Sequence, residues 1–202
     1  VSEVSELSSS DIAIIVNPNN PTGKVIADET LSELSKKVRI LIIDESFKMF
    51  STRRTQKFNN IIQINSLGKF FGLAGVRLGF VSGPSDFIKT VKAILGPWPV
   101  STLAAEIGIV ALNDKVWISE MEKILVTESN TLHEACSSKN WELIGKTSLF
   151  HTYATSSCLE VEKQFAAHGI WIRTFDYSQT WVRLGIPTSE NEWTRVKLAL
   201  NQ

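Results

Sequence analysis

The stretch Ser66-Leu-Gly-Lys69-Phe-Phe-Gly-Leu-Ala-Gly-Val-Arg77-Leu-Gly79 decides the fold that we predict for this chain. It follows the apolar run Ile61-Ile62-Gln-Ile64-Asn65, which is typical of a buried strand, and it leads into a second strand-like run at residues 80 and 81. A lysine confined among apolar residues loses proton affinity, so its free amine can attack a carbonyl carbon. Ser66 and Arg77 could hold an anion beside it. The stretch is suited to a phosphorylated aldehyde, although a plain strand connection with a solvent-reaching lysine would look the same.

The composition is that of an ordinary globular protein and argues against several functional classes. Hydrophobic residues make up 43% of the 202 residues and charged residues 21%. The 21 basic and 21 acidic side chains cancel, so we expect neither a nucleic acid partner nor an anionic membrane surface. No apolar run approaches the roughly 18 residues of a membrane span. Cys136 and Cys158 suggest neither a disulfide framework nor a metal site, which favours a reducing cytoplasm.

Strands and helices alternate in the first half of the chain. Residues 12–16, 40–43, 61–65 and 78–82 are predicted strands, and the continuous apolar run 12–16 is typical of a strand covered on both faces. Helices are predicted at 28–37, at 85–95 with Ser85 as its cap, from Ser101 or Thr102 to 112, and from Asp114 onward. This alternation predicts an α/β fold with a mainly parallel sheet and flanking helices.

The second half of the chain has a different pattern. Strands at 149–153, 170–175 and 181–186 are combined with helices at 159–168 and 189–200, which predicts a small α+β unit. We therefore predict a large domain at residues 1–113 and a small C-terminal domain at 114–202. The polar opening at Val1 is no signal peptide, and a strand follows it at once, so we expect the chain to begin partway through a domain.

Three unusual segments follow directly on apolar strands: Asn17-Pro-Asn-Asn20-Pro-Thr-Gly23, Asp44-Glu-Ser-Phe47 and Ser66–Lys69. In open α/β sheets, ligands bind beyond the carboxyl ends of the strands. If the strands are parallel neighbours, the segments converge on one pocket. Antiparallel strands would separate them.

Each polar residue in these segments has two interpretations. Asp44 ends an aliphatic run, so we expect it to be buried, either capping local backbone amides or facing a protonated ring nitrogen. Asn20 could be a turn residue or a donor to a ligand oxygen. Arg77 could lie on the surface, but its apolar neighbours favour a desolvated anion partner.

Taken together, these motifs resemble the pyridoxal-phosphate enzymes of the class I/II aminotransferase family, which have fold type I. The resemblance implies a partial cofactor-binding large domain followed by a small domain. It implies that Lys69 carries the cofactor covalently and that Asp44 pairs with its pyridine nitrogen. By the same resemblance, Asn20 bonds the ring hydroxyl, and Ser66 and Arg77 bind the phosphate. Arg183, in Trp181-Val-Arg-Leu-Gly-Ile-Pro187, aligns with the arginine that holds the substrate carboxylate, or is a strand-edge arginine.

Within that family, one branch is favoured. Gly96-Pro-Trp-Pro-Val-Ser101 and the segment His168–Asp176 are similar to the threonine-phosphate decarboxylases of cobalamin biosynthesis. Histidinol-phosphate aminotransferases are the nearest alternative. Phe47 stands where many aminotransferases have a tyrosine, which mildly supports the decarboxylase branch. Either branch implies a phosphorylated amino-acid substrate, for whose phosphate Arg173 and His151 are candidates.

The resemblance covers only the later part of the family's pattern. The first strands and helices are missing, and with them the aromatic residue that stacks on the pyridine ring. We therefore expect a truncated chain with weak cofactor affinity and little turnover of its own. A non-catalytic interaction domain that kept the site residues is the third hypothesis. Family members generally pair, so the resemblance also implies a homodimer.

Overall fold

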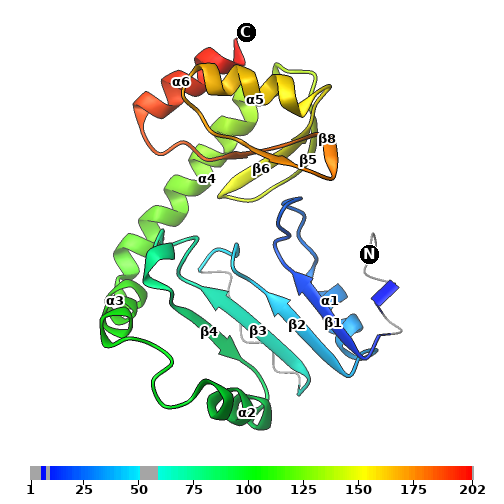
Figure 1. The fold of residues 1–202 in the computed structure, drawn as a ribbon, viewed down its shortest axis with the longest axis vertical. Helices are drawn as coiled ribbons and strands as arrows, with labels where there is room; N and C mark the ends of the chain where they lie inside the picture. Colours follow the sequence, from blue (N-terminus) through cyan, green and yellow to red (C-terminus); the bar gives the residue numbers. More distant parts are fainter. Residues whose placement is uncertain (1–5, 8–9, 51–58, 202) are drawn as a thin grey trace. The chain divides into compact units, whose positions relative to one another are not determined.

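The computed structural model describes residues 6–7, 10–50 and 59–201 (Figure 1). The polar segment 51–60 is also a predicted loop, and most of it lies outside the described residues. The chain divides into two compact units. Unit 1 comprises Val1–Asn19 and Val25–Ile118, and unit 2 comprises Asn20–Lys24 and Ser119–Gln202. The domain boundary predicted between residues 113 and 114 stays a prediction.

Unit 1 is built on a four-stranded sheet in the order β1-β2-β3-β4. Its strands are β1 (Ile12–Val16), β2 (Ile40–Asp44), β3 (Ile61–Ser66) and β4 (Gly79–Ser82). The pairs β1-β2 and β2-β3 are parallel, as predicted, whereas β4 is antiparallel to β3. The carboxyl ends of the three parallel strands therefore lie at the same edge of the sheet.

The helical segments of unit 1 precede or follow these strands. They are α1 (Asp28–Ser35), the 3₁₀ turn η2 (Ala74–Val76), α2 (Ser85–Leu95), α3 (Thr102–Asn113) and the start of α4 (Lys115–Ser137). The side chain of Ser101 caps α3, accepting a hydrogen bond from the backbone N–H of Ala104 at 3.1 Å. The predicted cap at Ser85 is wrong, because Pro84 occupies the N-cap of α2 and Ser85 is the first helical residue.

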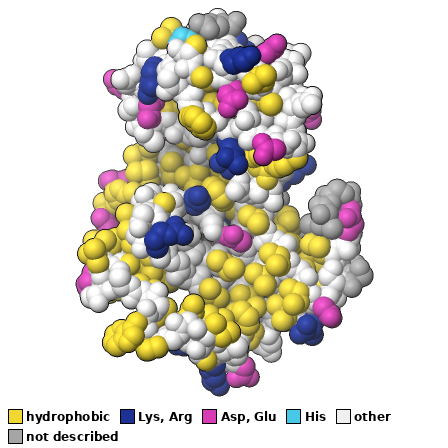
Figure 2. Space-filling model, viewed as in Figure 1, with side chains coloured by type: hydrophobic (Ala, Val, Ile, Leu, Met, Phe, Trp, Pro, Cys, Tyr) yellow, Lys and Arg dark blue, Asp and Glu magenta, His cyan; other side chains and the backbone are white. Residues whose placement is uncertain are grey.

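Only one face of β1 is covered, which corrects the expectation of a strand buried on both faces. Ala13 and Ile15 pack with Leu31 and Leu34 of α1, together with Leu41, Ile43 and Ile61 of the neighbouring strands. Ile12 and Ile14 point the other way and are exposed. Figure 2 shows hydrophobic side chains gathered on this face of unit 1. The apolar run therefore reflects one buried face and one exposed apolar face.

Unit 2 is an antiparallel sheet packed against helices. The strands are β5 (Glu142–Lys146), β6 (Phe150–Ala154), β7 (Arg173–Phe175) and β8 (Ser178–Gly185), in the order β5-β6-β8-β7. The helices are the rest of α4, α5 (Cys158–Ala167) and α6 (Glu190–Leu200). Strand β5 was not predicted. The core joins residues of α4, both shorter helices and the sheet, including Leu132, Phe165 and Val182. Among the described residues, no helix is both long enough and apolar enough to cross a membrane.

Candidate functional site

The segments Asp44–Phe47 and Ser66–Lys69 lie side by side in unit 1, after the carboxyl ends of β2 and β3. The third segment begins at the same edge, with Asn17 after β1. The backbone N–H of Asn17 donates to the carbonyl of Asp44 at 2.8 Å, and that of Glu45 donates to the carbonyl of Ile64 at 2.8 Å. Ser66 ends β3 two residues after Ile64. The three strands are parallel neighbours, which is the condition under which the predicted segments converge. The polar residues after β2 and β3 therefore share one edge.

Two adjacent carboxylates lie where β2 ends, and Asp44 is not buried as expected. Asp44 is only half-buried, whereas Glu45 is 1% exposed. Side chains alternate along a strand, so Glu45 continues the covered face of Leu41 and Ile43. Its carboxylate accepts hydrogen bonds from Lys48 Nζ at 2.7 Å and from Gln63 Nε2 at 3.1 Å. The buried charge expected at Asp44 is therefore found one residue later, with a cation beside it.

Asp44 uses one of its two carboxylate oxygens to shape the loop that follows. Its Oδ1 accepts hydrogen bonds from the backbone N–H of Ser46 at 2.8 Å and from the Ser46 hydroxyl at 2.5 Å. Asp44 thus caps local backbone amides, which is the first of its two predicted roles. Its Oδ2 takes no hydrogen bond from any described residue, so it can still accept one from a ligand. The two interpretations are compatible, because they use different oxygens.

The lysine loop is anchored by the neighbours of Lys69. Leu67, Phe70 and Phe71 are all buried, but Lys69 is exposed, so the expected desolvation by apolar neighbours does not occur. The backbone turns at the lysine, since Gly72 N–H donates to the Lys69 carbonyl at 3.0 Å. The Nζ atom of Lys69 lies 5.1 Å from the centroid of the Phe47 ring. This contact brings the lysine loop to the segment that begins at Asp44.

Ser66 and Arg77 lie at the two ends of the same loop. The Ser66 hydroxyl accepts a hydrogen bond from the backbone N–H of Gly68 at 2.9 Å. Arg77 adopts a left-handed backbone with φ of 55°, and its Nη1 donates to the carbonyl of Ala74 at 3.1 Å. Its side chain is exposed, so the expected desolvated anion partner is not supported by burial. An exposed guanidinium can nevertheless bind a phosphate from solvent.

Asn20 and Arg183 are brought together in unit 2. Arg183 Nη1 donates to Asn20 Oδ1, and the guanidinium carbon lies 4.8 Å from the centroid of the Phe150 ring. Burial lowers the pKa of Arg183, and the nearby Arg173 lowers it further. The predicted residues thus form two sets. Lys69, Asp44, Ser66 and Arg77 belong to unit 1, and Asn20 and Arg183 belong to unit 2.

His151 cannot bind a substrate phosphate as suggested from the sequence. It is fully buried on β6, and both ring nitrogens have partners. Its Nε2 lies 2.8 Å from the Ser129 hydroxyl, and its Nδ1 lies 3.1 Å from the Tyr153 hydroxyl. Arg173 is exposed on β7, and its role as a ligand of the substrate phosphate stays a prediction.

The hydrogen-bonded group of Glu45, Lys48 and Gln63 was not predicted from the sequence. Strand alternation alone could have indicated the burial of Glu45.

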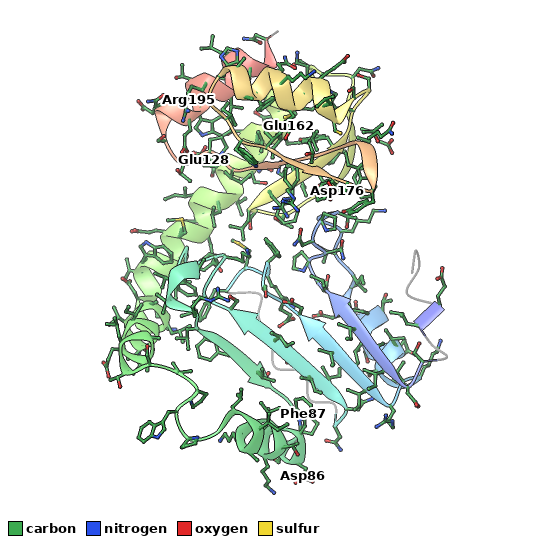
Figure 3. The ribbon with its side chains drawn as sticks, in the orientation of Figure 1. Asp86, Phe87, Glu128, Glu162, Asp176 and Arg195 are labelled. Carbon is green, nitrogen blue, oxygen red and sulfur yellow. The ribbon has the colours of Figure 1, made fainter. Side chains whose placement is uncertain are left out.

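A separate cavity of about 250 Å³ lies within unit 2. Its apolar wall includes Leu132 and Phe165, and Glu192 and Arg195 supply charged side chains (Arg195, on α6, is labelled in Figure 3). None of the residues predicted for the site lines this cavity. Its size and lining therefore do not bear on the predicted cofactor chemistry.

Comparison with known proteins identifies the family of the chain. The model of the family "Aminotransferase class I and II" matches residues 3–199. The chain belongs to the aminotransferase class I and II family. The enzymes of this family use pyridoxal 5'-phosphate. The match covers both units, so the fold class predicted from the sequence is confirmed.

Relatives of two activities resemble the chain. A threonine-phosphate decarboxylase of Pseudomonas aeruginosa is 32% identical over 96% of this chain and 61% of its own length. A histidinol-phosphate aminotransferase of Buchnera aphidicola is 32% identical over 63% of this chain and 38% of its own length. The solved histidinol-phosphate aminotransferase of Clostridium acetobutylicum superposes with a TM-score of 0.82 at 25% identity, covering 98% of this chain and 65% of that one. The chain thus spans about 61% of the decarboxylase that it matches.

The described side chains fit pyridoxal phosphate chemically. The cofactor requires an amine for its aldehyde, an anion for its ring nitrogen and donors for its phosphate. Unit 1 offers the exposed amine of Lys69, the open Oδ2 of Asp44, the Ser66 hydroxyl and the exposed guanidinium of Arg77. The close contact between Lys69 and Phe47 places the amine near the loop that Asp44 shapes. Each of these three groups of the cofactor therefore has a counterpart in unit 1.

Proposed function

We propose that this chain carries the cofactor lysine and most of the cofactor ligands of a pyridoxal-phosphate enzyme. The observation that carries the proposal is the contact of Lys69 with Phe47, at the edge where β2 ends in Asp44. A lysine amine, a carboxylate with an open oxygen, a hydroxyl and an exposed guanidinium form an unusual combination at one sheet edge and the loop that follows it. A plain strand connection does not account for this combination.

Each residue takes the role that the family resemblance implies, and its chemistry is suited to that role. When bound, the cofactor supplies an electron sink for the bond that breaks at the substrate Cα. Lys69 would hold the cofactor at its aldehyde carbon, and its amine could move a proton at the substrate Cα. Asp44 holds a proton on the ring nitrogen through Oδ2, and Ser66 and Arg77 orient the phosphate. Asn20 donates to the ring oxygen.

The reaction that we propose is decarboxylation of threonine phosphate. The resemblance to the Pseudomonas aeruginosa decarboxylase extends over 96% of the chain. Phe47 carries no hydroxyl, so the ring oxygen depends on Asn20. Arg183 would hold the substrate carboxylate, and the orientation that it gives the substrate Cα would select between loss of carbon dioxide and loss of a proton. Self-association as a homodimer belongs to the same proposal, and sedimentation would measure it.

Transamination is the second candidate. It is favoured by the 32% identity to the Buchnera aphidicola histidinol-phosphate aminotransferase, which equals the identity to the decarboxylase but covers less of the chain. It would use the same Lys69 and Arg183. The two reactions differ in what leaves the substrate Cα, which is carbon dioxide in decarboxylation and a proton in transamination.

One incubation separates the two reactions. A full-length version of the enzyme is incubated with pyridoxal phosphate and threonine phosphate, with and without an added keto-acid acceptor, because the 202-residue chain is expected to turn over little by itself. We expect carbon dioxide release that does not depend on the acceptor, lost in Arg183→Gln and kept in the control Arg195→Gln, another half-buried arginine of unit 2. Formation of a keto acid only with the acceptor would establish transamination. Binding of the cofactor with neither product would contradict both reactions.

A further inference from the structure

The segment Asn20–Lys24 belongs to unit 2, although the residues on both sides of it in the chain belong to unit 1. It contains Asn20, the residue that we assign to the cofactor ring oxygen. Ordering a five-residue segment of this kind costs backbone conformational entropy. Specific contacts must therefore hold it on unit 2.

The first contacts are hydrogen bonds from β6 and β8. Thr152, which is fully buried on β6, donates its hydroxyl hydrogen to the carbonyl of Pro21 at 2.5 Å. Arg183, which pairs with Thr152 across β6 and β8, donates to Asn20 Oδ1. Neighbouring positions of the sheet thus bind two successive residues of the segment.

The second contact is a close approach between two glycines. A Cβ on Gly145 would lie 2.6 Å from the Thr22 carbonyl oxygen, and one on Gly23 would lie 2.8 Å from the Gly145 carbonyl carbon. Real Cβ atoms do not approach backbone atoms so closely. Gly23 also has a φ of +74°, which favours glycine. The backbone of the segment therefore lies directly against β5.

We propose that Thr152 and Gly145 are positioning residues that hold Asn20 beside Arg183 before any ligand binds. This inference rests on the proposed function, because it gives the ring-oxygen ligand and the carboxylate ligand a common support. An ordered segment loses less entropy on binding, so the two contacts strengthen binding without touching the ligand. Ordinary packing would predict no link between these residues and cofactor affinity.

The test compares matched variants at two positions. Thr152→Val keeps the shape of the side chain but removes the hydroxyl, and Thr152→Ser keeps the hydroxyl. Gly145→Ala adds the obstructing Cβ, and Gly185→Ala is its control, since a Cβ there meets no atom within 4 Å. Hydrogen exchange of the backbone amides in residues 20–24 is measured on the cofactor-free chain. Pyridoxal phosphate affinity is measured by titration.

We expect Thr152→Val to speed amide exchange about fivefold to tenfold and to weaken cofactor binding by a similar factor, as loss of one hydrogen bond implies. Thr152→Ser and Gly185→Ala should match the wild type, and Gly145→Ala should exceed Thr152→Val in both effects. Unchanged exchange in Thr152→Val overturns the proposal, and so does faster exchange with unchanged affinity. If the wild type binds no cofactor, the proposed function fails, while the exchange comparison still decides whether Thr152 holds the segment.

Discussion

Asp44 and Glu45 are adjacent carboxylates with different tasks. Glu45 lies on the covered face of β2, where a buried charge requires a cation, and Lys48 supplies it at 2.7 Å. Asp44 lies on the other face and binds the backbone of Ser46 with one oxygen. One carboxylate therefore stabilises the strand end, and the other is available for a ligand.

Replacing Asp44 with Asn should separate its two roles. Asn keeps an oxygen that accepts from Ser46 N–H, so the free energy of unfolding should change by less than about 0.5 kcal/mol. The loss of charge removes a charge-assisted hydrogen bond to the cofactor, worth about 1.5–3 kcal/mol. We expect pyridoxal phosphate to bind about 10-fold to 100-fold more weakly, measured by spectroscopic titration. Full affinity in this variant would contradict the role assigned to Asp44.

Replacing Lys48 with Ala should destabilise the chain, because it leaves the Glu45 carboxylate buried with Gln63 as its only other described partner. We expect a loss of about 3 kcal/mol in urea unfolding. The control is Lys36→Ala, which breaks a pair of similar length with Glu33 whose two side chains are more than half exposed. That loss should be much smaller, because water screens an exposed ion pair. Equal losses in the two variants would show that burial of Glu45 is not what matters.

An aromatic cluster fixes the lysine loop against the start of α4. The rings of Phe70 and Phe71 are 5.0 Å apart at their centroids, and Trp117 lies 5.7 Å from the first and 5.6 Å from the second. These contacts hold the residues directly after Lys69. The position of the lysine thus depends on a helix that begins far along the chain.

Removing the Trp117 ring should therefore affect both stability and the site. We expect Trp117→Ala to lower the free energy of unfolding by about 2–3 kcal/mol and to weaken cofactor binding, because the lysine loop loses its packing partner. Trp98→Ala is the matched control, since that ring is 89% exposed. Denaturant unfolding and cofactor titration measure both effects. A stable Trp117→Ala variant with unchanged affinity would show that α4 does not position the loop.

Most strands and helices could be predicted from local patterns, because each has its own apolar run or cap. β1 begins and ends at its predicted residues, and α3 begins after its Ser101 cap. β5 was not predicted, since its sequence Glu-Leu-Ile-Gly-Lys has a short apolar core and depends on pairing with β6. The antiparallel direction of β4 likewise depends on the path of the lysine loop. Local sequence contains neither kind of information.

A buried polar network supports the core of unit 2. It links Ser129, His151 and Tyr153, and His133 lies 3.5 Å from the Tyr153 hydroxyl. Burial lowers the pKa of His151 to about 4, with smaller effects from Lys146 and His133. Burial also raises the pKa of the Cys136 thiol to about 11. The His151 ring is therefore neutral near physiological pH.

This network predicts how stability depends on pH. The pKa of His151 is about 4 in the folded chain and about 6.5 when unfolded, so the unfolded chain binds more protons between these values. Stability is fully present above pH 6.5 and falls by up to about 3 kcal/mol as pH decreases toward 4. Urea unfolding at about pH 7 and about pH 5 measures it. His151→Gln should flatten the decline, whereas His168→Gln, outside the network, should keep it. An equal decline in all three proteins would exclude His151 as its source.

The candidate site could be predicted only in part. The residues of unit 1 follow directly on parallel strands, so their shared edge could be predicted from the motif order. The attachment of Asn20 to unit 2 could not, because its neighbour Pro21 bonds to Thr152, which is 131 residues away. The exposure of Lys69 was also missed, since the apolar neighbours that seemed to enclose it are themselves directed into the core.

The most direct test of this account is the covalent attachment of pyridoxal phosphate. The full chain is mixed with the cofactor, reduced with borohydride and digested, and the modified peptide is identified by mass spectrometry. We predict modification at Lys69 and its loss in Lys69→Ala, with no loss in Lys89→Ala, an exposed lysine on α2. Modification spread over many exposed lysines, unchanged by Lys69→Ala, would contradict the assignment of Lys69 as the cofactor lysine.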